Sequence, residues 1–154
     1  MRRIIPLLLL LCIGVGSINA QKKEKFEDFV ELKGIKAVVI TKNMFNLIPE
    51  KSFGGSEIEF SSIMKKIESL IVLDNNSNVE GYEELKSKID KYIKDNKIEL
   101  VLFTKDDNSN TSIYLNDENS SSELIVYKSG DNAIKVVRLL GSFTLKEVQE
   151  IINK

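Results

Sequence analysis

Hydrophobic residues in the first half of the chain follow two patterns, helical spacing and unbroken apolar runs. Helical spacing predicts two helices. Residues 21–32 carry Phe26, Phe29 and Val30 at i, i+3 and i+4, and the apolar side chains of Phe60–Ile67 recur at i, i+3, i+4 and i+7. Unbroken apolar runs predict strands over Lys36–Thr41 and Leu70–Leu73. Because consecutive residues of a strand point to opposite faces, we expect the strand Lys36–Thr41 to be covered on both faces.

The second half begins with a helical pattern and then alternates with a period of two. Glu80–Asn96 places its apolar side chains on one face and predicts a helix. Thr144 and Glu147 have the spacing of a capping box, which predicts a last short helix reaching Ile152. The alternating segments predict four strands, over Leu100–Thr104, Ser112–Leu115, Leu124–Lys128 and Ile134–Leu140.

Short polar links join these four strands, and such links favour antiparallel neighbours. We therefore predict an α+β fold with a mostly antiparallel sheet built chiefly from a C-terminal four-strand meander. The helices Phe60–Ile67 and Glu80–Asn96 are expected to pack on one face, with the last helix at an edge. Residues 21–154 show no linker and predict a single domain.

The first twenty residues have the pattern of a signal peptide. Arg2 and Arg3 precede an apolar run that is too short for a membrane span, and Ala20 is small enough to precede a cleavage site. We predict cleavage after Ala20 and export to the periplasm, the cell surface or the medium; a retained N-terminal anchor is the alternative. Lipid anchoring at Cys12 is not expected, because Leu11 precedes it and apolar residues continue beyond it.

The composition narrows the possible chemistry. The chain has no histidine or tryptophan, and its one cysteine lies in the predicted signal peptide. A disulfide framework and the usual histidine and cysteine metal sites are therefore not expected, nor is any cofactor. Loss of Arg2 and Arg3 would change the formal charge from −1 to −3, which disfavours nucleic acid as a partner. The mature chain is predicted to have no transmembrane span.

Several short motifs resemble functional sites. Glu83–Glu84 and Asp106–Asp107 are paired carboxylates, but they lie on the polar side of a predicted helix and in a predicted turn. Asp74–Asn78 and Asp106–Asn110 resemble calcium loops but lack the glycine and the flanking helices of an EF-hand. The glycine-rich segment Ser52–Ser56 lacks the lysine of a phosphate-binding loop. No catalytic or metal-ligating residue is assigned from these motifs.

The apolar turn after the first predicted strand is the strongest candidate for a binding site. Met44, Phe45 and Leu47 follow the strand directly, and Phe53 lies nearby in sequence. Four apolar side chains on one turn, these three and Ile48, cannot all point inward. The turn either covers the end of the core or leaves an exposed apolar edge that binds a peptide or an envelope protein.

Three segments together resemble a known family. They are Ile40–Pro49, Ile67–Leu73 and Gly141–Val148, the last of which reads GSFTLKEV. The sequence resembles the small secreted Bacteroidetes proteins that share domain of unknown function 4252 (DUF4252). The resemblance implies export. It implies no activity, cofactor or site residue, because none is established for the family.

The leading functional hypothesis is a non-enzymatic binding or adaptor module of the bacterial cell envelope. The alternatives are a carrier of small ligands and an enzyme that uses carboxylates or a lysine. An exposed patch around Met44, Phe45 and Phe53 would favour a docking function. A lone buried carboxylate in a cleft would favour an enzyme, and a large internal cavity would favour a carrier. The sequence identifies neither the partner nor the oligomeric state.

Overall fold

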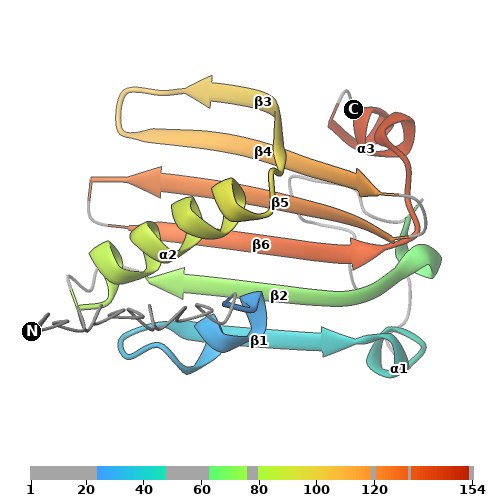
Figure 1. The fold of residues 1–154 in the computed structure, drawn as a ribbon, viewed down its shortest axis with the longest axis horizontal. Coiled ribbons are helices and arrows are strands. Elements are labelled where there is room, and N and C mark those ends of the chain that lie inside the picture. The colour runs from blue at the N-terminus through green and yellow to red at the C-terminus, as the bar shows by residue number, and fades with distance from the viewer. Residues whose placement is uncertain (1–23, 48–62, 76–79, 119–120, 132, 153–154) are drawn as a thin grey trace, which may run out of the picture.

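The computed structural model describes residues 24–47, 63–75, 80–118, 121–131 and 133–152. These residues form an open antiparallel sheet of six strands with a few helices (Figure 1). The strand order is β1-β2-β6-β5-β4-β3. The strands are β1 (Lys36–Thr41), β2 (Ile67–Asn75), β3 (Glu99–Lys105), β4 (Ser109–Glu118), β5 (Ser121–Gly130) and β6 (Ile134–Gly141). The α-helices are α1 (Lys42–Phe45), α2 (Tyr82–Asp95) and α3 (Leu145–Ile152), and the 3-10 helices are η1 (Phe26–Glu31) and η4 (Met64–Lys66).

The predicted α+β class and the C-terminal meander are confirmed. Strands β3 to β6 follow one another as antiparallel neighbours, each pairing with the next along the chain. Strand β2 then pairs with β6, and β1 pairs with β2 at the edge of the sheet. Among the described helices, none is long and apolar enough to cross a membrane.

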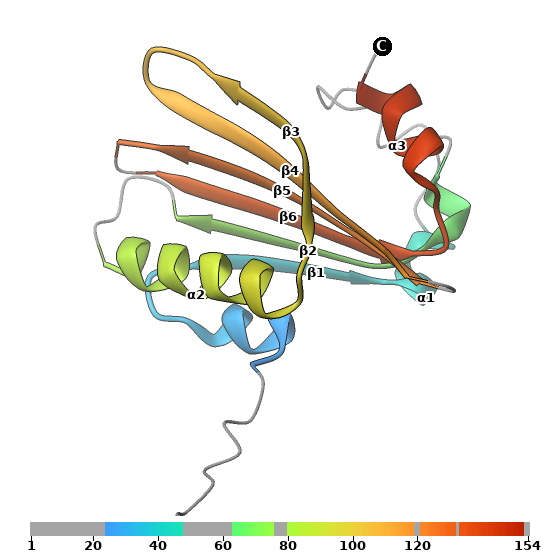
Figure 2. The same ribbon diagram turned by 45° about the horizontal axis from the view of Figure 1, so that its top comes forward.

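One face of the sheet, marked by Leu73, Val136 and Ile125, is covered by α2 and η1; we call it the helix face (Figure 2). Helix α2 buries one apolar side, carries acidic residues in its first turn and has Lys94 in its last turn, which suits the helix dipole. The phenylalanines of η1 complete this core. Its α2 and η1 members are Leu85, Ile89, Tyr92, Ile93, Phe26 and Phe29.

The opposite face of the sheet, marked by Val72, Val137 and Val126, is the valine face. A second apolar cluster covers the half of this face near α1 and α3. Phe45 of α1 and Val148 of α3 belong to this cluster. Helices α2 and η1 therefore pack on the helix face, whereas α1 and α3 pack on the valine face. The second cluster also contains Ile63, Met64, Ile67, Ile113, Leu115, Leu124, Leu139 and Phe143.

The predicted helix Phe60–Ile67 is wrong over its described part. Met64–Lys66 forms a single 3-10 turn, and Ile67 already begins β2 opposite Gly141. Ile63, Met64 and Ile67 are all buried in the second cluster, so their spacing reflected burial rather than a helix. Residues 60–62 lie outside the described part. In residues 21–32 the helical segment is likewise short, the 3-10 helix Phe26–Glu31.

Strand β1 has the predicted bounds, but it is not covered on both faces. Val38 points to the valine face and Val39 to the helix face, and both are exposed. The expectation was wrong because an apolar run can also form an edge strand whose side chains stay open to solvent.

Two turns, one at Gly34 and one at Gly81, pack closely together where α2 begins. Gly34 and Gly81 both have positive φ angles, and a Cβ atom on Gly81 would lie 2.4 Å from the carbonyl oxygen of Lys33. The buried Asn75 side chain donates hydrogen bonds to the carbonyl oxygens of Gly34 (3.1 Å) and Glu80 (2.7 Å). One amide group thus ties the end of β2 to both turns.

The capping box at the start of α3 is confirmed. The backbone N–H of Thr144 donates to Glu147 Oε2 (2.9 Å), and the backbone N–H of Glu147 donates to Thr144 Oγ1 (3.4 Å). Lys66 Nζ also donates to Glu147 Oε1, so the first turn of α3 is tied to η4.

Candidate functional site

The predicted docking residues lie at the end of β1, but they do not form one patch. Phe45 is only 8 % exposed and belongs to the second core cluster, whereas Met44 is 48 % and Leu47 82 % exposed. Phe53 lies outside the described residues. The turn therefore both covers the core and exposes apolar side chains, because Phe45 contributes to the core while Met44 and Leu47 lie at the surface.

The outer edge of β1 adjoins these exposed residues. Within the described ranges no strand pairs with that edge, since β2 occupies the only neighbouring position. Val38 is 53 % and Val39 43 % exposed, and they lie on opposite faces of the strand. Edge strands carry backbone groups that remain open to pairing with another chain. Apolar side chains thus flank a free edge on both sides.

A second candidate is a buried ion pair on the helix face. Arg138 of β6 and Glu123 of β5 are both buried, and Arg138 Nε donates to Glu123 Oε1. Tyr92 Oη of α2 donates to the same carboxylate oxygen at 2.9 Å. The paired charges and the hydroxyl hydrogen bond satisfy groups that would be costly to bury alone.

The N-terminal 3-10 helix closes over this ion pair. Arg138 Nη1 donates to Glu27 Oε1 at 2.7 Å, and the guanidinium lies 5.1 Å from the centre of the Phe26 ring. A pocket of about 340 Å³ opens at the rim. Its lining residues are Glu24, Lys25, Phe26, Glu27, Tyr92, Asn96 and Arg138.

The protonation states of this cluster follow from its burial and its neighbours. Burial works against the charge of the guanidinium, but the Glu123 carboxylate, with smaller contributions from Tyr92 and Glu27, more than offsets it, so the pKa of Arg138 is raised above its ordinary value. Burial, and then the charge of Glu123, raise the pKa of Tyr92. The guanidinium therefore stays charged and the phenol neutral at physiological pH, which suits a fixed ion pair rather than proton transfer.

Other residues singled out from the sequence are dispersed. Glu83, Glu84, Asp106 and Asp107 are exposed. Across the part of the chain that the structure describes, no group of three or more His, Cys, Asp or Glu side chains is placed to hold a metal ion. In the two calcium-like segments, Asn75 uses its amide to hold backbone carbonyls, and residues 76–78 lie outside the described part.

The Arg138–Glu123 pair was not predicted from the sequence, although a signal was present. Arg138 stands where the alternation of β6 calls for an inward apolar residue, after Ile134 and Val136 on the same face. A charged residue at such a position needs a buried partner. That this partner is Glu123 depends on the register between β5 and β6, which the sequence alone does not determine.

A family model described as a domain of unknown function (DUF4252) matches residues 21–151. No curated protein and no solved structure matches the chain.

Proposed function

Since the chain belongs to the family defined by this domain of unknown function (DUF4252), whose description assigns no activity, we propose its function from the geometry of its surface. The protein is a non-enzymatic binding module that is exported to the cell envelope. Its binding element is the free edge of β1 together with the exposed residues of the following turn.

The observation that carries this proposal is the exposure of apolar side chains on both faces of β1, whose outer edge pairs with no other strand in the described ranges. Val38 and Val39 lie on the two faces of β1, and Met44 and Leu47 are exposed in the turn that follows it. Proteins usually protect such an edge with charges, proline or a covering segment. In β1 the four central residues are Ala-Val-Val-Ile, with a charge only at Lys36.

The partner that fits this edge is an extended segment of another envelope protein. Such a segment would satisfy the outward backbone groups of β1 by forming a seventh strand, and its alternate side chains would contact Val38 and Val39. Met44 and Leu47 would add apolar contacts where the new strand passes the turn. Main-chain pairing supplies affinity in this mode, and the side-chain contacts supply specificity.

Export is the second part of the proposal. The signal-like pattern of residues 1–20 supports it, and the family match begins at residue 21, directly after the predicted cleavage site. Mass spectrometry of the protein recovered from cell fractions tests this part. A mature chain that begins at Gln21 outside the cytoplasm is the expected result, and an uncleaved chain in the cytoplasm would overturn it.

The binding element is tested by photocrosslinking in intact cells with a photoreactive amino acid at Met44. Met44 is preferable to Phe45, because a probe at the buried Phe45 would disturb the core. The same probe at Lys91, which is exposed on α2, serves as the control. One partner protein crosslinked from Met44 and not from Lys91 is expected.

A pair of edge variants decides whether that partner pairs with β1. Val38→Lys places a charge on the β1 edge, and Phe103→Lys makes the same change on β3, where the side chain is 54 % exposed. We expect Val38→Lys to abolish crosslinking from Met44 and Phe103→Lys to leave it unchanged. The proposal would be contradicted if the two variants reduced crosslinking equally, or if the probe at Met44 crosslinked no partner protein.

A further inference from the structure

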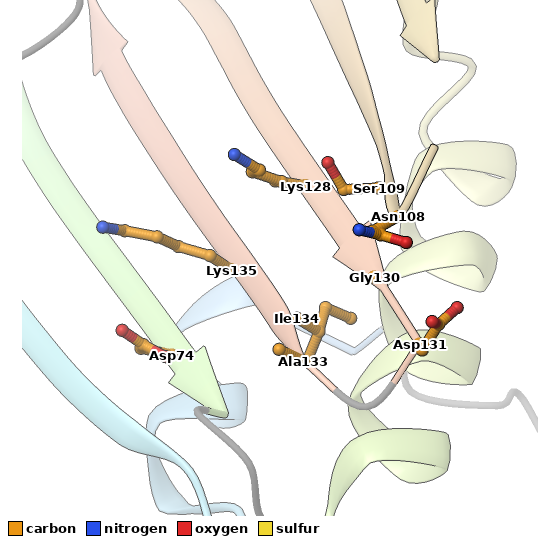
Figure 3. A pocket seen from close by; sticks show the side chains of 9 residues that line it. All are labelled: Asp74, Asn108, Ser109, Lys128, Gly130, Asp131, Ala133, Ile134 and Lys135. Carbon is orange, nitrogen blue, oxygen red and sulfur yellow. The ribbon is translucent and has the colours of Figure 1, made fainter. Parts of the chain in front are cut away.

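Two lysines project side by side from the valine face where β5 and β6 meet the turn between them. Lys128 and Lys135 are directly opposite each other in the register, and their side chains extend in the same direction (Figure 3). Directly opposed residues of antiparallel strands have Cβ atoms about 5 Å apart. A surface pocket of about 460 Å³ lies beside them, lined also by Asp74, Asn108, Ser109 and Asp131.

The two lysines make no direct ion pair with a neighbouring acid in the described residues, whereas Lys33, Lys66 and Lys88 each form one. Asp74 is opposite Lys135 in the register, but it also lies opposite Lys36 on its other side. The Asp131 carboxylate points away from both lysines (Figure 3). Like charges directly opposite each other destabilise a sheet, so a bound anion would stabilise this pair.

A row of apolar side chains runs beside the lysines. Two positions further along each strand, Val38, Val72, Val137 and Val126 are consecutive partners across β1, β2, β6 and β5. Val38, Val72 and Val137 belong to neither core cluster. Three adjacent strands span about 10 Å, so a cationic site adjoins an apolar strip of about that length.

The backbone in this strip determines which kind of ligand fits. Strands β2, β6 and β5 are interior strands with partners on both sides, so their backbone groups are committed to the sheet. A peptide lying across them would lose water from its own N–H and C=O groups without gaining hydrogen bonds. An acyl chain carries no such groups and loses nothing by lying there.

We propose that the valine face binds a free, single-chain anionic amphiphile of the fatty-acid type. Its carboxylate lies between the ammonium groups of Lys128 and Lys135, and its acyl chain lies along Val137 and Val72 toward Val38. A free molecule fits better than an anionic bilayer, because two lysines are fewer than the roughly four to eight clustered basic residues that typically hold a protein on such a surface. This inference goes beyond the proposed function and does not rest on it.

Isothermal titration of the purified mature domain with laurate, below the concentration at which laurate aggregates, tests the inference. Acetate provides the head group without the chain, and dodecyltrimethylammonium provides a similar chain with the opposite charge. Saturable binding of laurate, with no binding of the other two, is the expected result. Equal binding of the cationic amphiphile would overturn the proposal by showing that the head group is not recognised.

Matched variants locate the site. Lys128→Gln with Lys135→Gln should weaken laurate binding about tenfold or more, because two charge-assisted contacts are lost. Lys91→Gln with Lys94→Gln removes the same charge from the exposed side of α2 and should leave binding unchanged. Urea unfolding checks that both double variants fold. If the Lys128 and Lys135 variant folds normally and binds laurate as tightly as the unchanged protein, the proposed site is wrong.

Two further measurements separate this inference from the alternatives. Flotation with phosphatidylglycerol vesicles distinguishes a free amphiphile from a membrane surface; binding to vesicles without binding to laurate would overturn the proposal. Crosslinking from Met44 in the Lys128 and Lys135 variant should be unchanged, so failure of the lipid site and failure of the β1 edge are distinguishable.

Discussion

Tyr92 and Tyr127 allow a direct comparison of two buried hydroxyl groups in the same core. Tyr92 Oη donates to the Glu123 carboxylate at 2.9 Å, whereas Tyr127 Oη is buried without a hydrogen-bond partner in the described structure. A hydrogen bond to a charged group stabilises a protein by about 1.5–3 kcal/mol, and a buried polar group without a partner destabilises it by a similar amount. The two hydroxyls should therefore contribute to stability with opposite signs.

We expect Tyr92→Phe to lower the free energy of unfolding by about 2 kcal/mol and Tyr127→Phe to leave it unchanged or raise it by about 1 kcal/mol. Both changes remove one oxygen atom and keep the ring, so each variant serves as the control for the other. Urea unfolding followed by circular dichroism measures both, since the chain has no tryptophan to report by fluorescence. A clear loss of stability in Tyr127→Phe would mean that its hydroxyl has a partner.

At the residue scale the sequence indicates which side chains are unusual but not where they meet. Arg138 could be recognised as a charge in an apolar alternation, yet its partners Glu123 and Glu27 come from segments 15 and 111 residues away. Similarly, the turn after β1 was expected to divide between core and surface, and the structure assigns Phe45 to the core. Such assignments depend on tertiary packing, which spacing along the chain does not encode.

At the scale of elements, the start of α2 depends on a backbone conformation that only glycine adopts easily. Gly81 has a φ angle of 85°, and its missing Cβ leaves room for the carbonyl oxygen of Lys33. We expect Gly81→Ala to lower the free energy of unfolding by about 2 kcal/mol or more, because it adds both backbone strain and a clash. Urea unfolding measures the loss.

Ser87→Ala on the exposed side of the same helix is the control for this change. A surface substitution of this kind changes stability by at most about 0.5 kcal/mol. If Gly81→Ala behaved like Ser87→Ala, the close contact between the two turns would not contribute to stability.

The predictability of the elements differs between the two halves of the chain. The meander and α2 could be predicted because alternation and helical spacing each persist over a whole element there. The helix predicted over residues 63–67 and the predicted coverage of β1 were wrong, because a short apolar segment has the same composition in a 3-10 turn, a buried strand or an exposed edge. Only the neighbouring strand, far away in sequence, decides between them.

At the scale of the whole molecule, stability should fall in alkaline solution. Burial raises the pKa of both Tyr92 and Tyr127 in the folded protein, while in the unfolded chain a tyrosine ionises near its ordinary pKa of 10.0. Above pH 10 the unfolded state therefore loses protons that the folded state keeps. The free energy of unfolding is then unaffected by these groups below pH 10 and decreases as the pH rises above it.

Urea unfolding at a series of pH values between neutral and alkaline measures this decrease. The variant Tyr127→Phe removes one of the two groups and should show a shallower decline than the wild-type protein. Because lysines also titrate in this range in both proteins, the difference between the two slopes isolates the tyrosine. Identical slopes would show that Tyr127 ionises equally in both states.

The pairing of β2 with β6 also affects the order in which the strands can pair during synthesis. Residues 67–75 pair with residues 134–141, whereas β3 to β6 are joined by short turns. Local hairpins close quickly, and contacts between distant segments form slowly because a long loop must be ordered first. During synthesis the ribosome therefore releases β1 and β2, which pair with each other, well before β6, the strand that joins them to the rest of the sheet. The N-terminal part of the sheet thus stays separate from the meander until nearly the whole chain has emerged.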